Sequence, residues 1–194
     1  MGRWLLLAAG LAALAVSGHA PQAALACHPD RMSQLSVNLD RDAAKEEVVA
    51  ADLHDCAHTH FEAYVQIRDR CHGSWRTFDL ESEGEILQQF RVVNADGWTR
   101  RPEVFFVTVR RGPVASGIAE VVRLDGRPPA CARPRALFRY VPAPGVQDFD
   151  VQLKDLTRKF RGLEVVLTEG REVAQTTTTY RYDRARNRYV AYGS

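Results

Sequence analysis

Residues 37–49, VNLDRDAAKEEVV, decide how the fold is interpreted, because they fit two kinds of structure. Their density of charge is typical of a solvent-exposed helix. The oxygen-bearing side chains of Asn38, Asp40 and Asp42, on alternate residues, are equally typical of a loop that leads into a strand. The run 48–53, VVAADL, follows at once and begins with β-branched residues that favour a strand. A repeat of the segment elsewhere in the chain would decide between the two.

The pattern does recur. Segments that begin at Asn38, Asn94 and Asp155 each reach a glutamate nine residues later and then enter an apolar run. The glutamates are Glu47, Glu103 and Glu164, 56 and 61 residues apart, and the runs are 48–53, 104–109 and 165–169. Self-similarity at a nearly constant spacing is the signature of a repeat architecture. We therefore predict that residues 37–49 form a loop before a strand and not a helix.

The remainder of the chain also predicts strands. Runs rich in β-branched and aromatic residues lie at 61–68, 118–124, 136–141 and 176–182, with turn-forming residues between them. Only residues 81–90 have a weak helical period, and residues 176–192 predict a terminal hairpin. We expect an all-β domain of three degenerate units, at about residues 35–90, 91–148 and 149–194. Trp75 and Trp98 are expected in the core or between units.

A loop of the Asp-x-Asp-x-Asp type followed by Glu-Val-Val, repeated about every 60 residues, resembles the FG-GAP repeat of integrin α-subunits and the related VCBS repeat. The resemblance covers residues 35–192 and is degenerate, since the Phe-Gly and Gly-Ala-Pro signatures of that family are missing. It implies that each unit is a four-stranded blade of a β-propeller. It also implies an extracellular binding or structural role, with a protein or a carbohydrate as partner.

Three units are fewer than the four to eight blades of a usual propeller. The expected outcomes are a partial propeller, fused antiparallel sheets, or closure through self-association. All three have the same local structure, so the sequence does not choose between them.

The family resemblance further implies a calcium site in the loop. Calcium prefers hard oxygen ligands on alternate residues of a turn. The first unit supplies Asn38, Asp40 and Asp42, with Glu46 at the ninth position. In the second unit Trp98 replaces the third ligand, and in the third unit Lys159 would oppose a cation. A solvated acidic turn that leads into a strand is therefore the favoured interpretation of these loops, and a calcium site is the alternative, retained chiefly in the first unit and more weakly in the second.

The N-terminal sequence has the pattern of a secretory signal peptide at residues 1–26. Arg3 precedes an uncharged run at 4–16, and Ala24-Leu25-Ala26 matches a small-x-small cleavage site. The run is shorter than the roughly 20 residues that a membrane span needs, and no later segment is long enough. We expect a secreted or extracytoplasmic domain at residues 27–194. A lipid anchor at Cys27 is the alternative, disfavoured because Ala24 stands where a lipobox has leucine.

The four cysteines fit two disulfides in an oxidising compartment. Cys56 and Cys71 bracket the strand 61–68, so we expect these two to pair, and Cys27 to pair with Cys131 by exclusion. Four cysteines allow three connectivities, and the sequence alone does not exclude the other two.

Histidines gather beside these cysteines and suggest an alternative function. His54, His58 and His60 lie within seven residues, and His72 follows the next strand. Imidazole and thiolate ligands suit zinc or copper. The simpler interpretation is a polar loop that is held by a disulfide.

The sequence contains no catalytic signature. Gly-x-Ser-x-Gly, P-loop and dinucleotide-binding motifs are absent, and a net charge of +2 gives no drive toward nucleic acid. We predict a non-catalytic protein without catalytic residues or nucleic-acid partner. A secreted transition-metal-binding protein is the second choice and an extracellular hydrolase the third.

Overall fold

The computed structural model describes residues 31–42, 44–54, 61–97, 101–110, 116–126, 130–155, 162–171 and 174–192. These residues form strands, turns and loops, without a helix, so the expected all-β fold is confirmed. The helical period of residues 81–90 was misleading, because one strand ends at Gly84 and the next begins at Ile86. Consistent with this, the described chain offers no helix of the length and hydropathy that a membrane span requires.

The strands form three four-stranded antiparallel sheets, in each of which strands that follow one another in sequence are neighbours. Sheet A contains β1 (Arg31–Val37), β2 (Glu46–His54), β3 (Phe61–Cys71) and β4 (Ser74–Gly84). Sheet B contains β5 (Ile86–Val93), β6 (Glu103–Arg110), β7 (Ser116–Asp125) and β8 (Arg133–Tyr140). Sheet C contains β9 (Asp148–Asp155), β10 (Leu163–Arg171), β11 (Ala174–Asp183) and β12 (Arg188–Ala191). None of the three sheets closes on itself.

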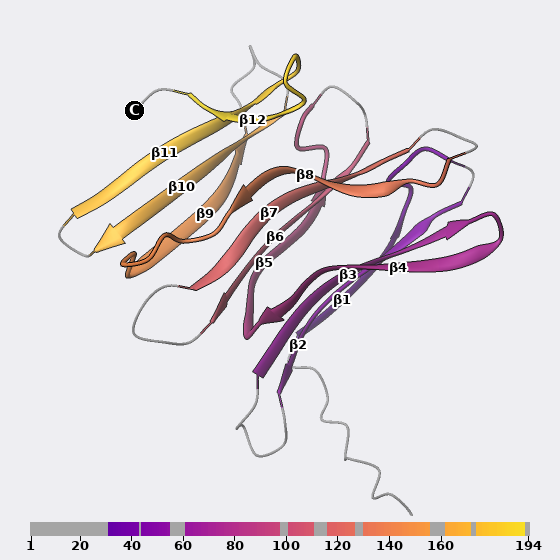
Figure 1. Ribbon diagram of the computed structural model, residues 1–194, viewed down its shortest axis with the longest axis horizontal. Coiled ribbons are helices and arrows are strands. Elements are labelled where there is room, and N and C mark those ends of the chain that lie inside the picture. The colour runs from indigo at the N-terminus through magenta and orange to yellow at the C-terminus, as the bar shows by residue number, and fades with distance from the viewer. Residues whose placement is uncertain are drawn as a thin grey trace, which may run out of the picture.

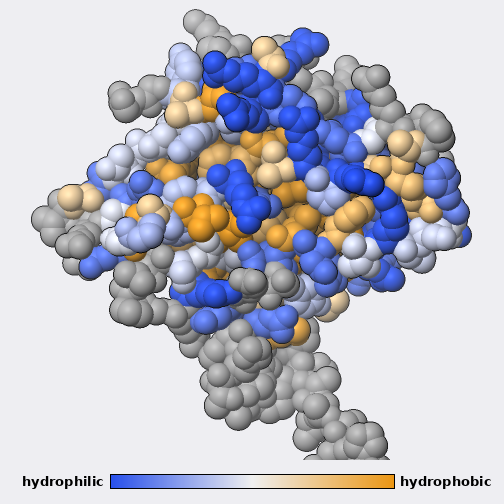
Figure 2. Space-filling view, viewed as in Figure 1, coloured by the Kyte–Doolittle hydropathy of each residue, from blue (hydrophilic) through white to orange (hydrophobic). Residues whose placement is uncertain are grey.

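Sheet B lies between sheets A and C, and the core has two layers (Figure 1). Val104 and Phe106 of β6 face the layer shared with sheet A, whereas Phe105 and Val107 face the layer shared with sheet C. Because β6 is covered on both faces, it reads as a continuous apolar run in place of the alternation of a half-exposed strand. Apolar side chains accordingly gather in the middle of the molecule, with polar ones around them (Figure 2).

One disulfide in the described residues joins the end of β3 to the segment before β8, between Cys71 and Cys131. The expected pairing of Cys71 with Cys56 is therefore wrong, and so is that of Cys131 with Cys27. Proximity along the chain suggested Cys56. The stacking of sheet B on sheet A instead brings a cysteine 60 residues away to the end of β3. Cys27 and Cys56 lie outside the described residues.

Of the two tryptophans expected in the core, only Trp75 lies among the described residues. Trp75 is 49% exposed on β4, an edge strand of sheet A, so its expected burial is wrong. Trp98 lies outside the described residues. The core instead takes its aromatic residues from sheets B and C, with Phe105, Phe106 and Tyr189 all buried.

Candidate metal centre

The loops after β1 and β5 have the same local conformation. The side-chain oxygen Oδ1 of Asn38 accepts the N–H of Arg41 at 2.6 Å, and that of Asn94 accepts the N–H of Gly97 at 2.9 Å. Arg41 and Gly97 both have positive φ, 71° and 68°. The left-handed conformation is natural for Gly97 and costlier for Arg41. The two Asx turns show that Asn38 and Asn94 occupy equivalent positions, as the sequence repeat predicts.

A buried glutamate at the start of the next strand completes each loop. The N–H of Leu39 donates to Oε2 of Glu46, and the N–H of Ala95 donates to Oε2 of Glu103 at 2.8 Å. Both glutamates are fully buried. The repeated glutamate of the first unit is therefore Glu46 and not Glu47, because this loop is one residue shorter than the other. Glu47 lies on the opposite face of β2 and pairs with Arg68 at 2.8 Å.

The residue opposite this glutamate on the third strand differs among the units. Hydrogen-bonded pairing begins at Glu47–Arg68, Val104–Val122 and Val165–Tyr180. One residue further out, Glu46, Glu103 and Glu164 therefore lie opposite Asp69, Arg123 and Arg181, respectively. Two units thus pair the glutamate with an arginine, and the first unit pairs it with another acid.

In the second unit the arginine neutralises the acids around it. Nη1 of Arg123 lies 2.9 Å from Oδ2 of Asp96 and 4.0 Å from Oε1 of Glu103, and all three residues are buried. Burial and the Asp96 charge raise the pKa of Glu103 to about 8. Arg123 also donates to Asn187 in the turn between β11 and β12, so the same guanidinium joins sheet B to sheet C. In the third unit Arg181 forms an ion pair with Glu164.

In the first unit the equivalent place is bordered by three carboxylates. Asp40, Glu46 and Asp69 present oxygens that all lie within 4.8 Å of one another. We call these three residues the acidic cluster. Oε1 of Glu46 is buried and has no hydrogen-bond partner. Desolvation, followed by the charges of Asp40, Asp42 and Asp69, raises the pKa of Glu46 to about 7, and desolvation also raises that of Asp40. An unpaired buried carboxylate oxygen is costly unless a cation or a proton satisfies it.

Two arginines lie near the acidic cluster, but neither takes the place of Arg123. Arg76 of β4 donates to Asp69 and to the carbonyl oxygen of Ala132. Arg101 lowers the pKa of Asp40 through its charge. Oε1 of Glu46 has no hydrogen bond in their presence; Oε1 of Glu103 has none either, but it has the charge of Arg123 at 4.0 Å.

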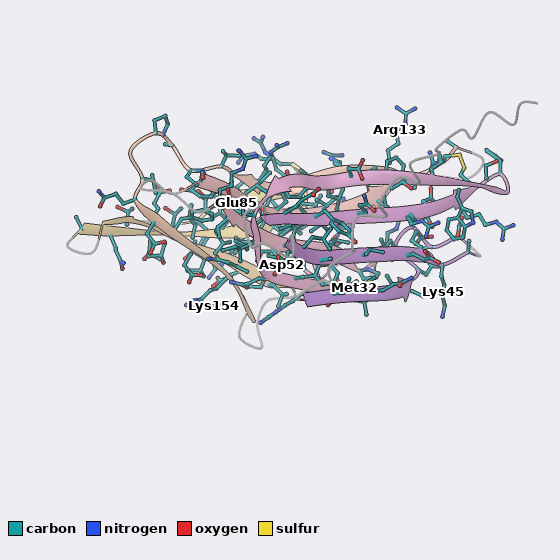
Figure 3. The ribbon with its side chains drawn as sticks, turned by 90° about the horizontal axis from the view of Figure 1, so that it is seen from below. Met32, Lys45, Asp52, Glu85, Arg133 and Lys154 are labelled. Carbon is teal, nitrogen blue, oxygen red and sulfur yellow. A yellow bond between two sulfur atoms is a disulfide. The ribbon has the colours of Figure 1, made fainter. Side chains whose placement is uncertain are left out.

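A pocket of about 260 Å³ gives access to the cluster from solvent. Asp40, Asp42 and Asp69 line it together with the disulfide of Cys71 and Cys131. In Figure 3 the disulfide, drawn as a yellow bond, lies at the same end of the molecule as Lys45, which follows the loop of the first unit. Half-buried Asp40 and buried Asp69 are therefore reachable from outside, and buried Glu46 lies behind them.

The structure uses the four expected calcium ligands in different ways. Asp40 and Glu46 belong to the acidic cluster. Asn38 is engaged in its own loop, where its side chain also donates to the carbonyl oxygen of Asp42. Asp42 lines the pocket, and one of its oxygens accepts the N–H of Ala44 at 2.6 Å.

Asp69 was missed by sequence reasoning because it lies on β3, outside the loop. The signal that could have found it is the repeat itself, since aligning the third strands would place Asp69 against Arg123 and Arg181. An alignment of the three units would show an acid in the first at the position where the other two have arginine.

The histidine cluster receives no support from the described residues. His58 and His60 lie outside them, as does the side chain of His54. His72 is exposed in the turn after β3, and its nearest candidate ligands, Cys71 and Cys131, are joined in the disulfide. Sulfurs in a disulfide are not thiolate ligands.

No protein-family model matches the chain, and no curated protein or solved structure has significant similarity to it. The resemblance to FG-GAP and VCBS repeats therefore has no support beyond the residues that suggested it.

Proposed function

We propose that this protein is a non-catalytic, extracellular β-repeat domain with a binding or structural role, and that one calcium ion stabilises its first unit. The observation that carries the proposal is that the first unit has Asp69 at the position where the other two units have an arginine. Where the second and third units place a guanidinium beside the repeated glutamate, the first unit places a third carboxylate. A cation is the missing partner of this arrangement.

The chemistry of the acidic cluster favours a hard cation such as calcium over zinc or copper. Its members are all carboxylates, which hard cations prefer, and zinc or copper would select nitrogen or sulfur ligands. Calcium accepts six to eight oxygens, so backbone carbonyls and waters from the open pocket can complete the shell. The free Oε1 of Glu46 fits this role, because it is buried, unpaired and within reach of the other two acids.

The outer face of sheet C is polar, which fits a sheet at the end of a stack. Terminal repeats of a stacked architecture need a polar outer face. On sheet C that face presents threonines, with Thr168 hydrogen-bonded to Thr177 at 3.3 Å, and the ion pair of Arg181 with Glu164. Within this proposal the three units are blade-like sheets stacked in sequence order.

The disulfide supports the proposed location. Disulfides persist in oxidising compartments and are rare where thiols are kept reduced. Together with the N-terminal sequence pattern, the bond between Cys71 and Cys131 favours a secreted or extracytoplasmic protein.

Calorimetric titration of the metal-free protein with calcium tests the proposal. We expect one site per chain, weaker binding of magnesium, and loss of the site in Glu46→Gln. Glu47→Gln is the matched control, since it removes the same charge one residue away on the opposite face of β2 and should leave binding intact. Absence of calcium binding, or equal loss in both variants, would refute the proposal.

A further inference from the structure

One edge strand of the molecule lacks the features that keep sheet edges from pairing with further strands. Each of the three open sheets has two edge strands, and the six are β1, β4, β5, β8, β9 and β12. An edge strand leaves alternate N–H and C=O groups without a partner, so it can accept another strand. Charged side chains, prolines, bulges or a very short edge strand oppose such pairing.

Five of the six edges carry at least one of these features. β8 has a proline, three arginines and a register shift, and β9 has four charged residues. β4 has four charged residues and register shifts, and β5 has an arginine and a register shift. β12 is only four residues long. These edges are therefore protected against a further strand.

The exception is β1, from Met32 to Val37. This stretch contains no charge and no proline, and its register with β2 has no shift. Met32 is 53% exposed and Leu35 is 42% exposed, and they are two of the five large apolar side chains that are exposed in the described part of the chain. Within that part, β1 forms backbone hydrogen bonds with β2 alone. Figure 3 shows Met32 on the outermost strand of sheet A.

The core layer between sheets A and B is also open beside β1. Val37 packs against this layer, and Ser33 and Leu35 share its face of the strand. Ser33 lines a pocket of about 310 Å³ together with residues 87–91 of β5. A further strand beside β1 would bring its own apolar side chains to this opening and cover Leu35.

The sequence of β1 is complementary to itself. In a two-fold antiparallel pairing that uses all seven residues of the strand, Gln34 lies opposite Gln34 of a second copy. Two such amides can pair, because each is both a donor and an acceptor. Leu35 then lies opposite Ser33 of the other copy, and Met32 lies opposite Ser36. Each exposed apolar side chain thus faces a small residue, and the two copies of Leu35 are diagonal neighbours.

Charge favours the same partner. Arg31, the one charged residue of β1, is placed opposite Val37 of the second copy, so the pairing sets no like charges against each other. A strand that carries charges would find no opposite charge between Met32 and Val37 and would lose hydration there. An uncharged strand avoids this loss, and β1 of a second copy is such a strand.

We propose that β1 pairs with β1 of a second copy and joins two copies of sheet A into one continuous sheet. Among the described strands no other edge is free of obstacles, so the assembly closes at two copies. A strand of seven residues is about 24 Å long and a sheet is about 10 Å thick, so the pairing covers about 240 Å² of edge on each copy. A stable complex covers about 800 Å² per partner. The dimer is therefore weak and forms at high micromolar concentration.

Sedimentation velocity of the mature chain, from micromolar to millimolar concentration, tests the inference. The mass should rise from one copy to two. Gln34→Lys and Gln34→Glu should each remain monomeric, because each sets two like charges directly opposite one another. An equimolar mixture of the two variants should dimerise again. Gln34 is exposed, so both variants should melt within a few degrees of the wild type. Gln175→Lys, the same change at an exposed position of sheet C, is the matched control and should dimerise normally.

Hydrogen exchange locates the contact. Amides within residues 31–37 should exchange more slowly at the dimeric concentration, and those of β4 should not change. A monomer at millimolar concentration, a dimer that survives Gln34→Lys, a mixture that fails to dimerise, or equal loss in Gln175→Lys would overturn the inference. Calcium titration of Gln34→Lys keeps the two proposals separate, since this variant should bind calcium like the wild type whichever way the dimer test falls.

Discussion

Asp69→Asn should remove the calcium response of the protein while leaving its calcium-free stability nearly unchanged. Two effects oppose each other in the metal-free state. At an effective dielectric constant of 20, two ionised carboxylates 4.8 Å apart repel by about 3.5 kcal/mol. The variant removes the repulsion of Asp69 by Asp40 and Glu46, and it also removes the attraction of Arg76 for Asp69. These terms are similar in size, so we expect the melting temperature without calcium to change by less than about 4 °C.

With calcium the melting temperatures of the wild type and of Asp69→Asn should differ. Free calcium at one hundred times its dissociation constant stabilises the wild type by about 2.7 kcal/mol, and each kcal/mol raises the melting temperature of a chain of this size by about 2–4 °C. The wild type should therefore gain roughly 5–10 °C, and Asp69→Asn less than about 2 °C, because its amide is a weaker ligand than a carboxylate.

Thermal denaturation followed by circular dichroism, in chelator and then in calcium, measures both quantities. Asp79→Asn is the control, since it removes an exposed carboxylate from the other face of sheet A. A full calcium response in Asp69→Asn, or a lost response in Asp79→Asn, would refute the reasoning.

Three further predictions concern the rest of the structure. Without calcium, the free energy of unfolding should fall as pH rises from about 4.5 toward 8. The reason is that buried Glu46 and Glu103 have pKa values of about 7 and 8, against 4.5 when exposed, and so bind protons more tightly in the folded state. Chemical denaturation across this pH range measures the trend, and a rise in stability with pH would contradict the prediction. Arg123→Met should lower the free energy of unfolding by about 3–5 kcal/mol, since it leaves buried Asp96 and Glu103 without a cation. Urea denaturation measures this loss, and an unchanged stability would contradict the role of Arg123. Opening the disulfide in Cys131→Ser should cost about 4 kcal/mol for a separation of 60 residues, and peptide mapping of the oxidised wild type should recover the Cys71–Cys131 linkage.

The repeat and the strand content could be predicted from the sequence because both follow from local patterns. Turn-forming residues and β-branched runs mark the strands one by one. The Asx turns of Asn38 and Asn94 depend on residues within a few positions of each other.

The one-residue error between Glu46 and Glu47 has a simple physical origin. Both positions are glutamate, and the loop of the first unit is shorter by one residue. Because adjacent strand residues point to opposite faces, this shift exchanges a buried carboxylate for a surface ion pair. Only the structure distinguishes the two, since Glu46 is fully buried and Glu47 is not.

The acidic cluster and the disulfide could not be predicted in full because each depends on how distant segments meet. Asp69 reaches Glu46 through the register of β2 and β3. Cys131 reaches Cys71 only after sheet B has stacked on sheet A. Neither contact leaves a local pattern, and for the disulfide the nearer cysteine in sequence was the misleading choice.

A crystal structure of the protein grown in millimolar calcium tests the central claim most directly. The account predicts one calcium peak in the difference density, bounded by carboxylate oxygens of Asp40, Glu46 and Asp69, with no such peak beside Arg123. A calcium-free acidic cluster under these conditions, with a guanidinium of Arg76 or Arg101 against Oε1 of Glu46, would contradict it.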